Sequence, residues 1–219
     1  MKVKASSLLN VVLAAGLVVV SAHLVAGRQP SDEKRTGGAG KLSDDAADAV
    51  YQNIMTRTSV RSYADRPVEK EKVDSLLHAG MAAPTALNRQ PWHFVVVDDR
   101  SLLDSIAAVT PNAGMARKAP LAIVVCGDKD KMAEGGARDM WSQDVSAATE
   151  NILLQAHAMG LGAVWTGTYP SEDRMKAISS LLNMPGNLVP FNTIVIGYPD
   201  GDTEPKDKWN EANVSYNRF

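Results

Sequence analysis

The longest regular pattern in the chain predicts a helix over residues 139–159. Its apolar side chains recur at intervals of three and four residues, which places them on one face of a helix. They are Val145, Ala148, Ile152, Leu153, Ala156 and Met159. Gly160 and Gly162 follow, and glycine is the usual residue beyond a helix C-terminus. This helix is therefore expected to face the core, in a domain large enough to cover it.

Shorter patterns predict the other elements. At 219 residues, with 45% hydrophobic and 22% charged side chains, the chain is long enough for one well-buried domain. Apolar runs predict strands over residues 93–97, 121–126, 163–169 and 191–197. Further helices are expected from Ser43 to about 56, from Pro67 to at most 83, and over 101–108.

The N-terminal segment indicates targeting. Lys2 and Lys4 precede an uncharged apolar stretch over residues 5–26, as in a signal peptide. An uncleaved membrane anchor is the alternative, because the stretch is nearly long enough to span a bilayer. We expect residues 1–27 to be a signal peptide or anchor, 28–42 a flexible linker and 43–219 the folded domain. The domain is then exported (periplasmic) or held at the membrane.

Composition excludes several classes of function. A net charge of −2 and a pI near 6.1 give no indication of a nucleic-acid surface. The single cysteine, Cys126, excludes an internal disulfide, and it lies in an apolar run where a buried strand residue is expected. The four histidines show no metal-ligand spacing. No metal site is expected.

The most informative polar motif runs from Arg57 to Tyr63. Arg57, Ser59 and Arg61 alternate, so in an extended segment they point to one side. Two guanidinium groups and a hydroxyl suit a phosphate or a polyol, because guanidinium offers a planar fork to anionic oxygens. A solvated, charged turn after a helix is the alternative.

A second polar loop lies between Pro84 and Trp92. It carries Thr85, Asn88 and Gln90, which are uncharged hydrogen-bonding side chains. A planar heterocycle with carbonyls and ring nitrogens would use partners of this kind. An ordinary connection between a helix and a strand would show the same residues.

Five motifs in this order resemble the nitroreductase family of FMN-dependent oxidoreductases. They are residues 57–61, 84–92, Glu150-Asn-Ile-Leu-Leu-Gln-Ala, Gly160-Leu-Gly-Ala-Val-Trp-Thr-Gly167 and Pro205-Lys-Asp-Lys208. The likeness covers roughly residues 46–216. It implies an α+β fold with a central, mainly antiparallel sheet flanked by helices, and an intertwined homodimer with two FMN sites at the interface.

The resemblance also implies which residues bind FMN. Phosphate and ribityl contacts fall on Arg57, Thr58, Ser59, Arg61, Lys206 and Lys208. Pro84, Thr85 and Asn88 would reach the flavin from the second subunit. Trp165 and backbone groups of Thr166, Gly167 and Thr168 would lie by the ring near N5, and the C-terminal extension would cross the partner chain.

The activity implied is that of an FMN-dependent NAD(P)H oxidoreductase with ping-pong kinetics. Nitroaromatics, quinones or activated alkenes would accept the electrons, and no side chain need act as a catalytic acid or base because the chemistry belongs to the flavin. Alternatives are a flavin-binding electron carrier without turnover, or a specialised branch such as a reductive dehalogenase. The sequence has no long insertion between residues 97 and 148 that could form a large lid over the flavin. This favours an open site. Trp141 would line that opening or pad the dimer interface.

Overall fold

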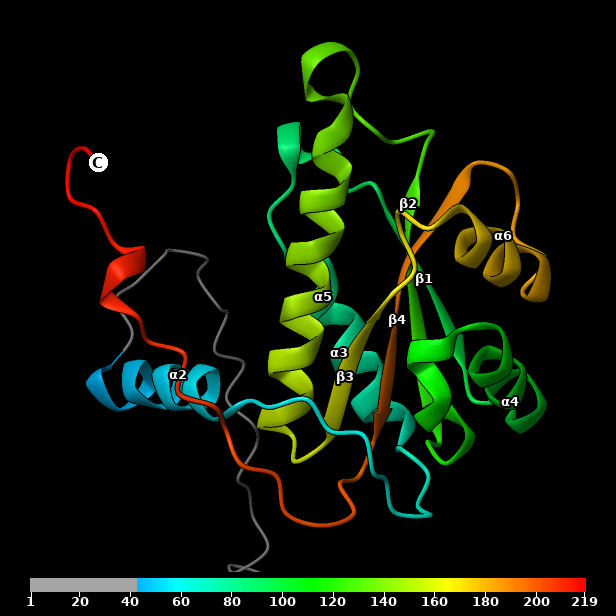
Figure 1. The fold of residues 1–219 in the computed structure, drawn as a ribbon, viewed down its shortest axis with the longest axis horizontal. Coiled ribbons are helices and arrows are strands. Elements are labelled where there is room, and N and C mark those ends of the chain that lie inside the picture. The colour runs from blue at the N-terminus through cyan, green and yellow to red at the C-terminus, as the bar shows by residue number, and fades with distance from the viewer. Residues whose placement is uncertain (1–42) are drawn as a thin grey trace, which may run out of the picture. The chain divides into compact units, whose positions relative to one another are not determined.

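A computed structural model describes residues 43–219, which are built on one antiparallel sheet (Figure 1). Its strands are β1 (Trp92–Val97), β2 (Leu121–Asp128), β3 (Gly162–Gly167) and β4 (Leu188–Gly197), in the order β1-β2-β4-β3. Every neighbouring pair of these strands is antiparallel, which confirms the fold class expected from the family resemblance.

The predicted targeting segment, residues 1–27, and the linker, residues 28–42, lie outside the described part of the chain. From residue 43 onward, no helix is both long enough and apolar enough to cross a bilayer.

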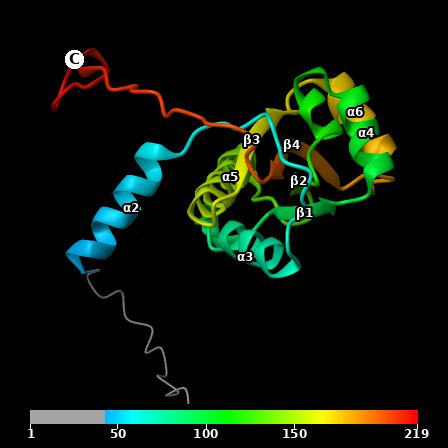
Figure 2. The same ribbon diagram turned by 90° about the horizontal axis from the view of Figure 1, so that it is seen from below.

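Helices cover both faces of the sheet. Figure 2 shows α3 (Lys70–Met81) and α5 (Trp141–Ala158) on one face, and α4 (Arg100–Val109) and α6 (Glu172–Leu181) on the other. Two apolar clusters match these layers, one around Ile152 of α5 and one joining α4 to Ile178 of α6. The central strand β2 is buried along its whole length because both of its faces are covered.

The core confirms the interpretation of Cys126 as a buried strand residue. Its side chain is fully buried on β2, and burial raises the pKa of the thiol to about 12. The sulfur therefore remains a protonated thiol at physiological pH and packs as a small apolar group.

Several predicted boundaries were wrong. The second helix begins at Lys70 instead of near Pro67. The predicted helix over 139–159 begins as the 3₁₀ turn η3 (Gly135–Met140), and only from Trp141 onward is it α-helical. Strand β4 begins three residues earlier than expected, because the bulge opposite Val125 and Cys126 accommodates Pro190 within the ladder.

Helix α6 was not predicted at all. Ile178 is its only fully buried residue, so the sequence shows no apolar stripe of the kind that revealed α5.

The first described helix, α2 (Asp44–Thr56), buries none of its residues. Ser43, where this helix was expected to begin, is its N-cap: the Ser43 hydroxyl accepts a hydrogen bond of 3.2 Å from the amide of Ala46. Val50 and Ile54 of α2 are exposed in the single chain, as is the C-terminal stretch from residue 201 onward.

Candidate functional site

The stretch Arg57–Arg61 lies along the free edge of β3. Ser59 forms a parallel bridge with Ala163, and the amide of Val60 donates to the Ala163 carbonyl over 3.1 Å. Val60 is buried against Gly162, where any Cβ would collide with the valine side chain. Since Val60 points inward, the side chains on either side of it point away from the core, as the alternating pattern predicted.

Tyr63 fastens this stretch to the sheet. Its buried hydroxyl lies 2.7 Å from the Val60 carbonyl oxygen and 3.0 Å from that of Val195, and it can donate to either. Burial raises the pKa of the phenol well above its ordinary value, so the hydroxyl keeps its proton at physiological pH. Sequence analysis did not single out Tyr63 for this role.

A cleft of about 480 Å³ opens beside the stretch. All six residues expected to contact the phosphate and ribityl groups line it. The complete lining is Ile54, Met55, Arg57, Thr58, Ser59, Arg61, Lys206, Lys208 and Trp209. Four of these side chains are cationic and none is acidic, so the cleft attracts anions.

The cations of the cleft are largely available to a ligand. Arg57 is 18% exposed and pairs through Nε with Glu150 of α5 at 3.3 Å, which leaves its two terminal nitrogens unengaged by that contact. Within residues 43–219, Arg61, Lys206 and Lys208 form no ion pair. Glu150 therefore orients one guanidinium, a role that the sequence motif did not reveal.

The predicted ring-binding residues lie at the other end of β3. Gly167 follows Ala163, which lies beside the cleft, by four residues, or about 13 Å along a strand. A Cβ built on Gly167 would meet nothing within 4 Å, so there is open space beside this residue. Trp165 is half-buried, and its ring packs edge-on against that of Phe191, with the ring centres 5.7 Å apart.

Not every polar group near this end of β3 is free to bind a ligand. The Thr166 hydroxyl is buried and donates to the Thr193 carbonyl over 2.7 Å. The Thr168 amide donates to the Phe191 carbonyl over 3.1 Å. The Thr168 hydroxyl is buried and has no hydrogen-bond partner in the described structure. Arg174, which sequence analysis missed, donates to the Gly167 carbonyl over 3.2 Å.

The loop that carries Pro84, Thr85 and Asn88 does not line the cleft of its own chain. It forms the 3₁₀ turn η1 (Ala86–Asn88), with φ near +53° at Leu87 and Asn88. The Thr85 hydroxyl accepts from the Gln90 amide over 3.1 Å, and the Gln90 side chain donates to that of Asn88 over 3.1 Å.

A buried carboxylate holds this loop against α5. Oδ1 of Asp144, which is 7% exposed, accepts a hydrogen bond of 2.9 Å from the Ala86 amide. Trp141, in the same helical turn, is 8% exposed and packs into the core, where it also borders a second cavity.

Fold and cleft together define a class of protein: an α+β domain with a cationic cleft at the edge of an antiparallel sheet, suited to a phosphorylated ligand.

The chain belongs to the nitroreductase family. The sequence profile of that family matches residues 54–110 and 104–198. An NADH dehydrogenase/NAD(P)H nitroreductase from Methanothermobacter thermautotrophicus is 42% identical over 170 residues, covering 78% of this chain and 87% of that protein.

Solved structures agree with this family assignment. A crystal structure of an NADH dehydrogenase/NAD(P)H nitroreductase from Parabacteroides distasonis is 45% identical, with a TM-score of 0.74, covering 78% of this chain and 99% of that one. A nitroreductase from Desulfovibrio desulfuricans, solved in complex with FMN, is 32% identical with a TM-score of 0.66, covering 78% of this chain and 97% of that one.

His157 of α5 contacts Thr56, the last residue of α2. Its Nε2 lies 2.9 Å from the Thr56 hydroxyl, which itself donates to the Gln52 carbonyl over 2.6 Å. The hydroxyl has one proton, so Nε2 must donate to it. Burial, and secondarily the charge of Arg57, lower the pKa of His157.

We predict that acid destabilises the protein through His157. Because its pKa is lower in the folded than in the unfolded chain, the unfolded chain binds the proton first as the pH falls below about 6.5. His157→Gln keeps a donor but cannot titrate, so it should lose less stability than the wild type between pH 7.5 and 5.5. Urea unfolding at both pH values measures this, and equal losses would contradict it.

Proposed function

We propose that the chain is an FMN-dependent oxidoreductase that passes electrons from NAD(P)H or another donor to nitroaromatics, quinones or activated alkenes by a ping-pong scheme. The observation that carries this proposal is the convergence of Arg57, Arg61, Lys206 and Lys208 on one cleft. Membership of the nitroreductase family and the FMN complex of the Desulfovibrio desulfuricans relative support it.

The cleft suits the phosphate end of FMN. The Nε contact with Glu150 orients the Arg57 fork, and Arg61 and the two lysines add charge, so several charge-assisted hydrogen bonds to phosphate oxygens are available. The hydroxyls of Thr58 and Ser59 line the same cleft and suit the polyol chain.

The far end of β3 suits the ring. Open space beside Gly167 lets a planar ring lie against the backbone, and Trp165 supplies an apolar surface nearby. FMN, when bound, supplies the electron-transfer chemistry, and the chain's own residues bind it, orient it and limit its contact with water. Donor and acceptor would take turns in the space beside Gly167, which is the basis of the ping-pong proposal.

The active form is proposed to be a homodimer whose two sites are shared between subunits. On α2, the apolar side chains Val50, Tyr51, Ile54 and Met55 are each at least 50% exposed. In the C-terminal stretch, Trp209 is 76% exposed and Tyr216 is 84% exposed. A second chain would cover these surfaces and bring its Pro84, Thr85 and Asn88 loop to the site.

The FMN site is tested by Arg57→Ala. Loss of a charge-assisted contact to phosphate should weaken FMN binding by roughly 1.5–3 kcal/mol, or about 10- to 150-fold. Fluorescence titration of the folded apoprotein measures this. Arg117→Ala is the matched control, because Arg117 is exposed on the 3₁₀ segment Pro111–Arg117 and does not line the cleft.

The same variants test the activity. With limiting FMN, Arg57→Ala should oxidise NADPH with a nitroaromatic acceptor more slowly than the wild type, and excess FMN should restore much of the rate. Arg117→Ala should match the wild type throughout. An FMN-loaded wild type that is reduced once without turnover would indicate an electron carrier, and unchanged FMN affinity would remove Arg57 from the site.

We predict that FMN binding and dimerisation are linked, because a ligand bound only by the dimer stabilises the dimer. Deleting residues 206–219 should impair both. Changing Lys206 and Lys208 together to glutamine should weaken FMN binding at unchanged dimer affinity for the apoprotein, whereas Trp209→Ala should act first on the dimer. Sedimentation with and without FMN measures both properties, and a stable monomer with a full complement of FMN would refute the shared site.

Export or membrane attachment through residues 1–27 is also proposed, from Lys2, Lys4 and the apolar stretch that follows. NAD(P)H would then reduce the purified protein, while a membrane quinol or an exported redox protein would be the donor in the cell. A C-terminal reporter active only in the cytoplasm should stay silent on the full chain and be active on residues 43–219. Strong activity on the full chain would contradict this localisation.

A further inference from the structure

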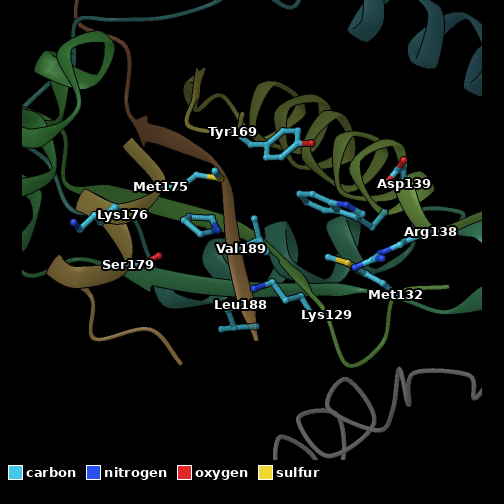
Figure 3. A pocket seen from close by; sticks show the side chains of 12 residues that line it. Lys129, Met132, Arg138, Asp139, Tyr169, Met175, Lys176, Ser179, Leu188 and Val189 are labelled. Carbon is cyan, nitrogen blue, oxygen red and sulfur yellow. The ribbon is translucent and has the colours of Figure 1, made fainter. Parts of the chain in front are cut away.

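A second cavity, of about 680 Å³, lies where α6 and the start of β4 meet η3 and the first turn of α5 (Figure 3). It shares no lining residue with the cationic cleft. Tyr169, on its wall, follows Gly167 by two residues. The cavity therefore lies just beyond the end of β3 that is proposed to face the flavin ring, and the proposed function leaves it unused.

One side of the cavity is aromatic and rigid. The rings of Trp141 and Tyr169 meet nearly edge to face, 5.1 Å apart at 74°, and Tyr169 stacks on Phe191 at 5.9 Å. Trp141 is fixed because it packs directly on Gly127, where any Cβ would overlap the indole. Val189 and Pro190 of β4 also line the cavity. A flat apolar ligand would find preformed walls here.

Three cationic side chains also line the cavity. Lys129, Arg138 and Lys176 line the cavity, and Asp139 is the one acid that does so. Lys129 is oriented by its hydrogen bond of 2.9 Å to the Gly186 carbonyl. Arg138 and Lys176 have no ion-pair or hydrogen-bond partner within residues 43–219, so their donors are free for a ligand.

We infer that this cavity binds a planar aromatic carboxylate, with the ring against Trp141 and Tyr169 and the carboxylate on Arg138. The unpaired guanidinium fork matches the two oxygens of a carboxylate. The three cations exceed the single acid by two charges, which suits an anionic ligand. Asp139, next to Arg138 in the chain, disfavours a phosphate that carries two charges.

The inference is tested by calorimetric titration of the full chain in the presence of FMN. The probes are 2-naphthoate and 2-naphthamide, which share the ring system and differ in charge. We expect the carboxylate to bind at least about tenfold more tightly than the amide, the lower range for one charge-assisted contact. Arg138→Gln should reduce naphthoate affinity about tenfold and leave naphthamide affinity unchanged.

Two further variants complete the design. Arg117→Gln removes one positive charge from a remote exposed position and should leave naphthoate affinity unchanged. Ser179→Phe, on α6, should fill part of the cavity and weaken both probes while FMN binding persists.

Equal affinities for naphthoate and naphthamide, or unchanged naphthoate affinity in Arg138→Gln, would overturn the inference. Tighter binding of 2′,5′-ADP than of naphthoate, lost in Ser179→Phe, would overturn it too and assign the cavity to a nucleotide. Because FMN binding is followed separately by absorbance, failure here leaves the proposed FMN site untouched, and failure of FMN binding leaves this test intact.

Discussion

Everything at the cationic cleft depends on the pairing of one irregular segment with the edge of β3. Residues 57–61 belong to no regular strand, but two contacts hold them in place. The Val60 amide donates to the Ala163 carbonyl, and the Tyr63 hydroxyl lies within hydrogen-bond distance of the Val60 carbonyl. Once Val60 is buried, its polar neighbours must face outward. Arg57 and Ser59 thus reach one cleft because a valine and a tyrosine are held in the core.

Sequence patterns predicted those parts of the fold in which one face is strongly apolar. The core of α5 and the four strands were recognised because their side chains recur at helical or strand intervals. Helix α6 escaped because it buries a single residue fully, and the start of β4 was missed because Pro190 sits at a bulge. Local periodicity does not register an element that is specified mainly by its neighbours in space.

The candidate site was predictable to a similar degree. The cations Arg57, Arg61, Lys206 and Lys208 were identified from sequence, and the structure brings them together. The motif could not reveal that Glu150 orients Arg57, or that the Thr166 hydroxyl is engaged in the core, because both contacts join segments distant in sequence. Side-chain type can be read along the chain, whereas direction depends on tertiary contacts.

The hydrogen bond from the Ala86 amide to Asp144 has a consequence for how a shared site could assemble. The backbone of Leu87 and Asn88 lies in the left-handed region, which residues other than glycine seldom adopt. The loop therefore needs support to keep its shape. Asp144 provides it from within the same chain. A subunit would then meet its partner with this loop already in shape, and little further conformational entropy would be lost on association.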